Sequence, residues 1–366
     1  MKNTFGTSVS VTVFGESHGE AIGAVIDGIS PGIEIDYDFI DAQLLRRRPS
    51  SAIDTARQEK DKYKIISGVF EGRTTGTPIA IVIPNEDTRS KDYSILASVA
   101  RPSHADYTAE CKYHGYQDYR GGGHFSGRIT AALVAAGAIC LSALKNIGID
   151  IGTHILKCAG VSDRAFNKAQ DDIALLKCKS FPILSDCEEA MCEAILKAKA
   201  NRDSVGGVLE TAIVGMPKGV GEPWFDSVES MLSHALFGIG GIKGIEFGTG
   251  FALADMMGSE ANDCMRMDNG RVVTVTNHNG GINGGITNGM PIIFKCAVKP
   301  TPSISSEQMS VDFKLGENKT LVIEGRHDPA IVRRAAVVVD SVSAICIADM
   351  LAQRYGTDVF TRGDKL

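Results

Sequence analysis

The residues most able to do chemistry stand in four short segments that are rich in glycine or basic. The first, residues 14–19, places His18 in a glycine-bounded turn, where an imidazole can act as an acid or a base near neutral pH. The second, residues 46–49, contains three consecutive arginines, whose guanidinium groups bind phosphate or carboxylate through paired N–H groups. Each segment alone also has a structural explanation, as a surface hairpin turn or as the basic end of a helix.

The third segment joins Arg101 and His104 to the triple glycine of residues 119–123. The glycines run into Ser126 and Arg128 at the start of a long apolar stretch. Backbone N–H groups at the start of a helix bind anions, and a hydroxyl and a guanidinium beside them strengthen such a site. His104 could donate a proton to a departing oxyanion. The alternatives are a structural histidine and a close-packed glycine turn.

The fourth segment, residues 325–329, places Arg326 two positions before Asp328. Asp328 is expected to cap the following helix, and a capping carboxylate keeps a second oxygen for catalysis. Two further stretches, residues 277–285 and 299–303, could contact a cofactor with a flat polar edge and a phosphate. The alternative for these stretches is a set of turns in a glycine-rich protein.

A glycine pattern at residues 238–244 nearly matches the dinucleotide-binding fingerprint. Its third glycine is one residue late, and the pattern follows a predicted helix instead of a strand. The sequence also lacks the GxxxxGK[ST] phosphate loop. Neither nucleotide-binding motif is therefore expected.

These segments need secondary structure to position them. Strands are predicted at residues 9–14 and 21–26 around His18, and a helix at residues 38–48 that Pro49 ends. Residues 127–147 predict a helix with little polar face, which indicates burial. Further strands are predicted at residues 64–70, 78–83, 208–214, 271–276 and 290–297, and further helices at residues 186–200, at residues 227–237 and after Asp328-Pro329. Strand pairs between long helices, without regular βαβ order, predict an α+β fold in one domain.

Composition limits the class of protein. The chain has 366 residues, 43% of them hydrophobic and 22% charged, which excludes a disordered protein. A net charge of −6 argues against general nucleic-acid binding. Nine cysteines without Cys-x-x-Cys or zinc spacing predict reduced thiols, no metal site and a cytoplasmic location. No signal peptide is apparent, and four charges in the apolar residues 330–351 argue against a membrane span.

The residues alone therefore predict an enzyme that handles a small phosphorylated polyanion, with a flat cofactor. A non-catalytic module that binds RNA phosphates is one alternative, although 6% aromatic residues offer few stacking platforms. A flavin enzyme with a different phosphorylated substrate is another.

Taken together, the segments resemble the chorismate synthase family over residues 6–350. The motifs that carry the resemblance are FGESHG at 14–19, RRRP at 46–49, the segment 101–106, YRGGG at 119–123, HNGGINGGITNG at 278–289, KPTPSI at 299–304 and GRHDP at 325–329. Each motif is weak alone, but their order in a chain of this length is highly specific.

The resemblance implies a lyase that eliminates phosphate from 5-enolpyruvylshikimate 3-phosphate in the 1,4-anti sense, giving chorismate at the last common step of the shikimate pathway. It implies reduced FMN as cofactor, with NAD(P)H only indirectly as reductant, through a possible external flavin reductase. It also implies a single-domain β-α-β sandwich over residues 1–366, with long helices between antiparallel sheets, assembled as a homotetramer in the cytoplasm.

The resemblance also implies roles for individual residues. His18 would supply a proton to the reduced flavin, His104 would protonate the departing phosphate, and Asp328 would assist deprotonation at the central-ring nitrogen of the flavin. The implied substrate-binding residues are Arg47, Arg48, Arg101, Ser126, Arg128 and Arg326. The implied flavin-binding residues are His124, Phe125, Ser126, Gly240, Gly241, Gly284, Lys299, Pro300, Thr301, Pro302, Ser303 and Arg326.

The chain departs from the family pattern at three places. His124-Phe125 stands where many members have Arg-Ser, Ile53 stands where many have Arg, and Ala330 stands where Cys is common. The first two departures remove cations from the implied site, so the number of substrate-binding arginines is open. We expect the third to be neutral.

Overall fold

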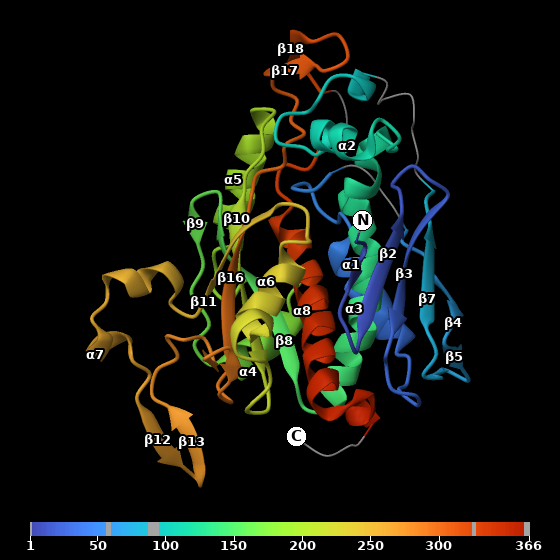
Figure 1. Ribbon diagram of the computed structural model, residues 1–366. Helices are drawn as coiled ribbons and strands as arrows, with labels where there is room; N and C mark the ends of the chain where they lie inside the picture. The colour runs from blue at the N-terminus through green and yellow to red at the C-terminus, as the bar shows by residue number, and fades with distance from the viewer. Residues whose placement is uncertain (1, 56–59, 87–94, 324–326, 362–366) are drawn as a thin grey trace.

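Two five-stranded antiparallel sheets form the frame of the protein. The computed structural model describes residues 2–55, 60–86, 95–323 and 327–361 (Figure 1). The first sheet has the order β1 (Thr4–Phe5), β2 (Ser10–Gly15), β3 (Ala21–Asp27), β7 (Ile79–Pro84) and β4 (Lys64–Ser67). The second has the order β11 (Ile242–Phe247), β16 (Ile292–Val298), β10 (Gly207–Val214), β8 (Asp150–Cys158) and β9 (Val161–Ser162).

Two long helices fill the space between the sheets. Helix α3 (Thr130–Asn146) contacts β3 and β7 of the first sheet, and α8 (Val332–Tyr355) contacts β8 and β10 of the second. The two helices also pack on each other, as Figure 1 shows, and a Cβ at Gly137 would lie 2.3 Å from that of Ser341. Small residues on α3 therefore let the helix axes approach closely, and the main core gathers around them.

Shorter elements surround this frame. The remaining helices are α1 (Tyr37–Arg47), α2 (Asp106–Tyr113), α4 (Ala169–Lys177), α5 (Glu188–Ala200), α6 (Val228–Leu236) and α7 (Gly258–Ala261). Within the described residues the remaining strands form four hairpins: β5 (Val69–Phe70) with β6 (Arg73–Thr74), β12 (Met265–Asp268) with β13 (Arg271–Thr274), β14 (Ile282–Asn283) with β15 (Ile286–Thr287), and β17 (Gln308–Asp312) with β18 (Glu317–Leu321).

Most predicted elements occur at the predicted places. The hairpin around His18 is β2–β3, and α1 ends at Arg47, just before Pro49. The predicted buried helix begins with a 3₁₀ turn at Gly127–Ile129 and continues as α3. The predicted strand at residues 64–70 is instead two strands, because Gly68 takes a left-handed φ of 81° between them.

The predicted start of the last helix was wrong. The N-cap of α8 is Ile331, without a side-chain cap, so Asp328 lies outside the helix. The Asp328 carboxylate instead accepts hydrogen bonds from the Thr55 amide and from Arg334. Arg334, in the first turn of α8, thus binds a carboxylate oxygen of Asp328 that a capping interaction would have used.

The sequence reading missed several elements. Strand β8 lies in the interior of the second sheet and has residues buried on both faces, so it lacks a clean alternation of polar and apolar residues. Strand β11 begins inside the glycine-rich stretch after α6. Such positions are specified by neighbouring strands more than by local pattern.

Residues 248–276 form an arm that projects from the body (Figure 1). Within the described structure β12 and β13 pair only with each other. The arm exposes large apolar side chains: Phe251, Met257, Met265, Met267, Val272 and Val275.

Two helical segments are long and apolar enough to cross a membrane by length and composition, residues 127–146 and α8. The charges in α8 therefore do not by themselves exclude a span. The core helices of a soluble protein pass the same test, and 94% of the apolar window in α8 is buried inside the protein. Both helices are apolar because they pack between the two sheets.

Candidate active site

The triple glycine brings the two candidate histidines together. Gly121 and Gly122 have left-handed φ values of 59° and 87°. A Cβ on Gly121 would lie 2.3 Å from Cε1 of His18, and a Cβ on Gly122 would lie 3.0 Å from Cε1 of His104. The two imidazoles therefore lie against adjacent backbone positions that only glycine can fill without displacing them.

Hydrogen bonds attach the His18 loop to the glycine turn. The Ser17 amide donates to the Gly123 carbonyl at 3.1 Å, and the Ser17 hydroxyl lies 3.1 Å from Nδ1 of His18. His124 lies 2.8 Å through its Nδ1 from the Gly15 carbonyl, which can only accept a hydrogen bond. His124 thus fixes the His18 loop from the other side, at a position where many family members carry arginine.

A buried carboxylate orients His104. Asp106, in the first turn of α2, lies 2.8 Å from Nδ1 of His104 and accepts hydrogen bonds from Nε and Nη2 of Arg101 at 2.8 and 2.7 Å. Burial alone would raise the pKa of the Asp106 carboxyl, but hydrogen bonds from Arg101 and His104 hold it well below its ordinary value. Nη2 of Arg101 also lies 3.0 Å from Nδ1, so the carboxylate and the guanidinium both hold the imidazole at Nδ1 and leave Nε2 of His104 for a ligand.

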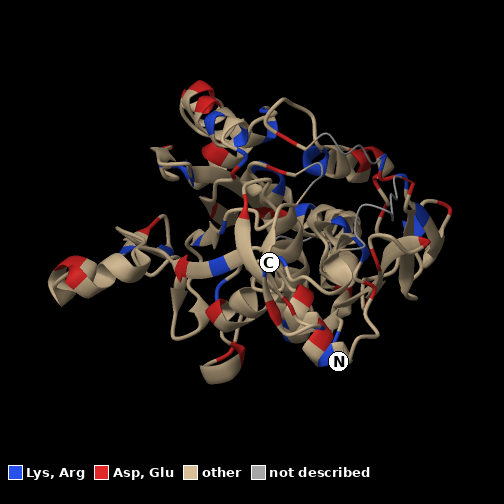
Figure 2. Cartoon of the chain, turned by 90° about the horizontal axis from the view of Figure 1, so that it is seen from above, with Lys and Arg blue, Asp and Glu red and all other residues tan. Residues whose placement is uncertain are grey.

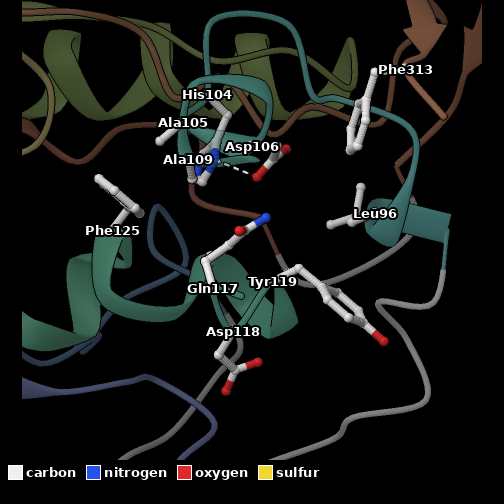
Figure 3. Close-up of a pocket in the computed structure, with 11 residues that line it drawn as sticks. Leu96, His104, Ala105, Asp106, Ala109, Gln117, Asp118, Tyr119, Phe125 and Phe313 are labelled. Atoms are coloured by element: carbon white, nitrogen blue, oxygen red, sulfur yellow. Dashed lines mark hydrogen bonds and ion pairs between the residues drawn. The ribbon is translucent and has the colours of Figure 1, made fainter. Parts of the chain in front are cut away.

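A shallow hollow lies beside this pair. Its volume is about 300 Å³, including space open to solvent. Figure 3 shows His104 and Asp106 at one side, with Phe125, Gln117 and Tyr119 around the opening. The ring of Phe125, a predicted flavin contact, is 43% exposed here.

Three of the predicted arginines converge on Asp61, a carboxylate that was not predicted from the sequence. Asp61 accepts a hydrogen bond from Nη2 of Arg47 at 2.7 Å and another from Arg128, and its Oδ2 lies 3.8 Å from Nε of Arg48. Burial would raise the pKa of the Asp61 carboxyl, but Arg47 and Arg128 hold it below its ordinary value. Burial also lowers the pKa of the Arg47 guanidinium.

Asn85 connects the arginines to the His18 loop. It follows β7, and its Nδ2 donates to the carbonyls of Glu16 and Gly19, each at 2.9 Å. Its Oδ1 accepts from Nε of Arg128 at 3.1 Å. Ser126, another predicted substrate contact, accepts from the Arg128 amide at 3.3 Å and caps the 3₁₀ turn. The histidine and arginine segments therefore form one continuous hydrogen-bonded region.

Two further arginines stand at the start of α8. Arg333 donates to Asp54 at 2.5 Å and to the Arg48 carbonyl at 3.2 Å, and Arg334 donates to Asp328. The sequence signal for both was their position as charges in an otherwise apolar segment. The C-terminal end of α1 and the N-terminal ends of α3 and α8 thus bring their arginines to one region.

This concentration of cations is local. Figure 2 shows basic and acidic residues interspersed along the chain when it is seen from above. The arrangement therefore suits a small anion better than a long nucleic-acid backbone.

The predicted flavin loop of residues 299–303 lies against the His104 loop. Lys299 donates through Nζ to the Ser103 carbonyl, and Ser303 accepts from Nη1 of Arg101 at 3.3 Å. The Lys299 amide also donates to the Gly241 carbonyl at 2.9 Å, which places Gly240 and Gly241 nearby. Pro300 and Pro302 flank Thr301 in the sequence of this loop.

Several features of this region favour a bound ligand. Among the described residues Thr301 Oγ1 is buried without a hydrogen-bond partner. A Cβ at Gly240 would meet no described atom within 4 Å. Burial lowers the pKa of the Lys299 ammonium group, and the charge of Lys243 lowers it further. The donors and open backbone fit a phosphorylated cofactor with polar edges.

Gly284 does not join this group within one chain. It lies between β14 and β15, where the Gly285 carbonyl accepts from the Val228 amide at the start of α6. Gly240 and Gly241 instead follow the end of α6, which is about 13 Å long. Arg326, the remaining predicted binding residue, lies outside the described residues.

The departures from the family pattern have structural correlates. Ile53 and Ala330 are both buried among apolar side chains of the main core. A cation at position 53 would therefore need a different local packing. Among the described residues no group of three His, Cys, Asp or Glu side chains could hold a metal ion.

Comparison with known proteins assigns this arrangement to a family. The family model described as Chorismate synthase matches residues 9–352. The chain belongs to the chorismate synthase family. Chorismate synthase from Lachnoclostridium phytofermentans is 46% identical over 351 residues, which cover 95% of each chain. That of Thermococcus kodakarensis is 43% identical over 351 residues, 95% of this chain and 97% of the relative.

A solved crystal structure of chorismate synthase has the same fold. It superposes with a TM-score of 0.75 at 28% identity, over 96% of this chain and 94% of the other. The predicted combination of helices with antiparallel sheets is thereby confirmed. The reaction is that of chorismate synthase, a carbon–oxygen lyase that removes phosphate from 5-enolpyruvylshikimate 3-phosphate. This assignment replaces the RNA-binding module and the flavin enzyme with another substrate.

Proposed function

We propose that the elimination takes place where His18 and His104 lie against the triple glycine, with reduced FMN as cofactor. The supporting observation is the contact of the two imidazoles with adjacent glycines, Gly121 and Gly122. Asn85 and Arg128 extend this region to the arginine cluster. Proton donors and anion binders thus stand side by side, as loss of a phosphate from a polyanion requires.

The arginines bind the substrate. Fixed guanidinium groups hold phosphate and carboxylate without reorganisation as the reaction proceeds. The proposed binding residues are Arg47, Arg48, Arg101, Ser126, Arg128 and Arg326. Arg101 also holds Asp106, so it contributes to the orientation of His104 as well.

His104 gives its proton to the departing phosphate. Asp106 fixes Nδ1, so Nε2 is the group that faces the leaving oxygen when the imidazole is doubly protonated.

His18 and Asp328 handle protons on the cofactor side. His18 is buried beside Ser17 and Gly121, which excludes bulk water from its ring. Asp328 is held by the Thr55 amide and Arg334, so its orientation is fixed before the cofactor binds. We propose that His18 donates a proton and that Asp328 accepts one.

Residues of the flavin loop hold the cofactor, which when bound supplies electron density to the substrate ring. The support is the orphaned hydroxyl of Thr301, the open backbone at Gly240 and the ammonium group of Lys299. The proposed set is His124, Phe125, Ser126, Gly240, Gly241, Lys299, Pro300, Thr301, Pro302, Ser303 and Arg326, whereas Gly284, at the opposite end of α6, stays a prediction from the family resemblance. The reductant comes from outside the chain, from NAD(P)H through a separate flavin reductase.

The assembled form is a homotetramer of single-domain chains, residues 1–366, in the cytoplasm. One core of apolar residues extends through the contacts of both sheets with the helices, which supports a single domain. The exposed methionines and Phe251 of the arm support association with further copies, because soluble monomers rarely expose such patches.

An anaerobic assay tests the proposal. Purified protein, reduced FMN and 5-enolpyruvylshikimate 3-phosphate are expected to release phosphate and form chorismate in equal amounts. Omission of the reductant should abolish both signals. Release of phosphate without chorismate, or no turnover with reduced flavin, would contradict the proposed site.

A further inference from the structure

Asp61 stands beneath the arginine cluster without reaching the surface. Its side chain is fully buried, whereas those of Arg128, Arg47 and Arg48 are 3%, 8% and 28% exposed. The exposure therefore rises from the carboxylate through Arg128 and Arg47 to Arg48, so the approach from solvent leads to the guanidinium groups before it leads to Asp61. Any effect of Asp61 on the ligand acts through the arginines.

Both oxygens of Asp61 organise the cluster. Oδ2 accepts from Arg47 at 2.7 Å and lies 3.8 Å from Nε of Arg48, while Oδ1 accepts from Arg128. Arg47 lies on α1 and Arg128 on the 3₁₀ turn before α3, so one carboxylate joins two elements. Without it, three like charges would repel each other in a buried region.

The backbone at Asp61 is unusual. Its φ of 50° lies in the left-handed region, which costs free energy for every residue except glycine. Aspartate tolerates this region better than most residues, but the strain persists only where surrounding contacts outweigh it. Here those contacts are the hydrogen bonds to Arg47 and Arg128.

The charge of the cluster suits a doubly charged anion. Three guanidinium groups and one carboxylate leave a net charge of +2, and a phosphate monoester carries up to two negative charges. Arg333 and Arg334 do not add to this excess, since Asp54 and Asp328 neutralise them.

We propose that Asp61 is a positioning residue for substrate binding, which holds Arg47, Arg48 and Arg128 together as one anion-binding group. The inference rests on the proposed function, because it assumes that these arginines bind the phosphorylated substrate. It assigns no proton transfer to Asp61.

The test compares Asp61→Asn with Asp172→Asn. Asp172 is also a buried carboxylate with two hydrogen bonds from an arginine, Arg164, but it belongs to α4, away from the site. Both variants should lower the melting temperature. Only Asp61→Asn should raise KM for 5-enolpyruvylshikimate 3-phosphate, by tenfold or more, with kcat within threefold of wild type. The reason is that the arginines which Asp61 positions bind the substrate and the transition state equally well, so their loss weakens binding without slowing the chemical step. Competitive inhibition by inorganic phosphate should weaken in parallel.

Calorimetric titration of the substrate without flavin separates this inference from the proposed function. Asp61→Asn should bind the substrate at least tenfold more weakly than wild type, even if no turnover occurs. Wild-type affinity in a folded Asp61→Asn protein, or a loss of kcat with KM unchanged, overturns the proposal. If Asp61→Asn does not fold, Asp61→Glu replaces it. Its extra methylene displaces the guanidinium groups, so KM should again rise, and a wild-type KM overturns the proposal.

Discussion

At the scale of single residues, His104 depends on a partner that is close in sequence. Asp106 follows it by two positions, and its carboxylate lies 2.8 Å from Nδ1 of the imidazole, which fixes the orientation of the ring. Arg101 binds the same carboxylate, so the three residues form one unit that is held before any ligand arrives. Such a unit resembles the histidine–carboxylate pairs that orient general acids in other enzymes.

We expect His104→Ala to lower kcat by about 10²- to 10⁴-fold, the usual contribution of a general acid. The affinity for reduced FMN should change little, because the proposed flavin loop contacts the main chain at Ser103 and not the imidazole. Anaerobic turnover at saturating flavin and a flavin titration measure the two effects. Weaker flavin binding with unchanged turnover would contradict the proposed role.

At the scale of elements, the triple-glycine turn decides where both imidazoles lie. Sequence inspection identified the turn as a possible anion site, but it did not identify the contacts with His18 and His104. Those contacts depend on how residues 120–124 pack on the loop after β2, which is a tertiary arrangement.

Gly122→Ala should reduce activity far more than its effect on stability explains. A Cβ at this position would lie 3.0 Å from Cε1 and 3.3 Å from Nε2 of His104, so the imidazole must move. Gly148→Ala is the matched control, since Gly148 has a φ of 83° and no described atom within 4 Å of a Cβ. Both variants should lose about 1–2 kcal/mol of stability from backbone strain. Only Gly122→Ala should lose activity, and equal activities would contradict this assignment.

A second element-scale feature is the buried ion cluster that ties β8 to β10 and to the segment after β9. His154 lies 3.1 Å from Asp163 through Nδ1 and 2.9 Å from Glu210 through Nε2. Burial alone would lower the pKa of the His154 imidazolium, but hydrogen bonds to Asp163 and Glu210 raise it above its ordinary value. The charged form therefore stabilises the fold.

The raised pKa predicts how stability depends on pH. The contribution of His154 is fully present below the unfolded value of about 6.5 and is lost as pH rises through the folded pKa. His154→Gln should therefore destabilise the protein by about 3 kcal/mol at pH 6, and by less at pH 9. Urea unfolding at both pH values measures the difference. A destabilisation that does not shrink at pH 9 would show that the imidazole is neutral in the folded protein.

At the scale of the whole molecule, the helices between the sheets and the projecting arm have separate tasks. The apolar helices hold the two sheets together and bring their arginine-bearing ends to one region. The arm contributes little to this core, since β12 and β13 pair only with each other in the described structure.

We expect lysine substitutions at Met265 and Met267 to weaken the proposed tetramer without unfolding the chain. Both side chains are about two-thirds exposed, at 68% and 67%, so their replacement leaves the core intact. Light scattering should detect a smaller species, while the melting transition of the chain remains cooperative. Replacement of the exposed Met309, on the β17–β18 hairpin, is the control and should leave the mass unchanged. An unaltered mass in the arm variant would place the interface elsewhere.

The sequence by itself was sufficient for the family, for most strands and long helices, and for the histidines and arginines proposed for catalysis and binding. Its information is local: hydrophobic period, glycine and proline at turns, and motifs that keep their residue types in order. Asp61 and Asn85 carried no such local signal, because their importance comes from partners 14 and 43 residues away.

Only the tertiary structure decided which charged groups face one another. In the structure Asp328 does not cap α8, and Gly284 lies apart from the flavin loop. The carboxylate of Asp61 contacts three arginines. The physical reason is that electrostatic and hydrogen-bond interactions depend on distance in space, and distance in space follows from how the sheets and helices pack. The distance between two charged groups cannot be predicted from the types of the two residues and their positions along the chain.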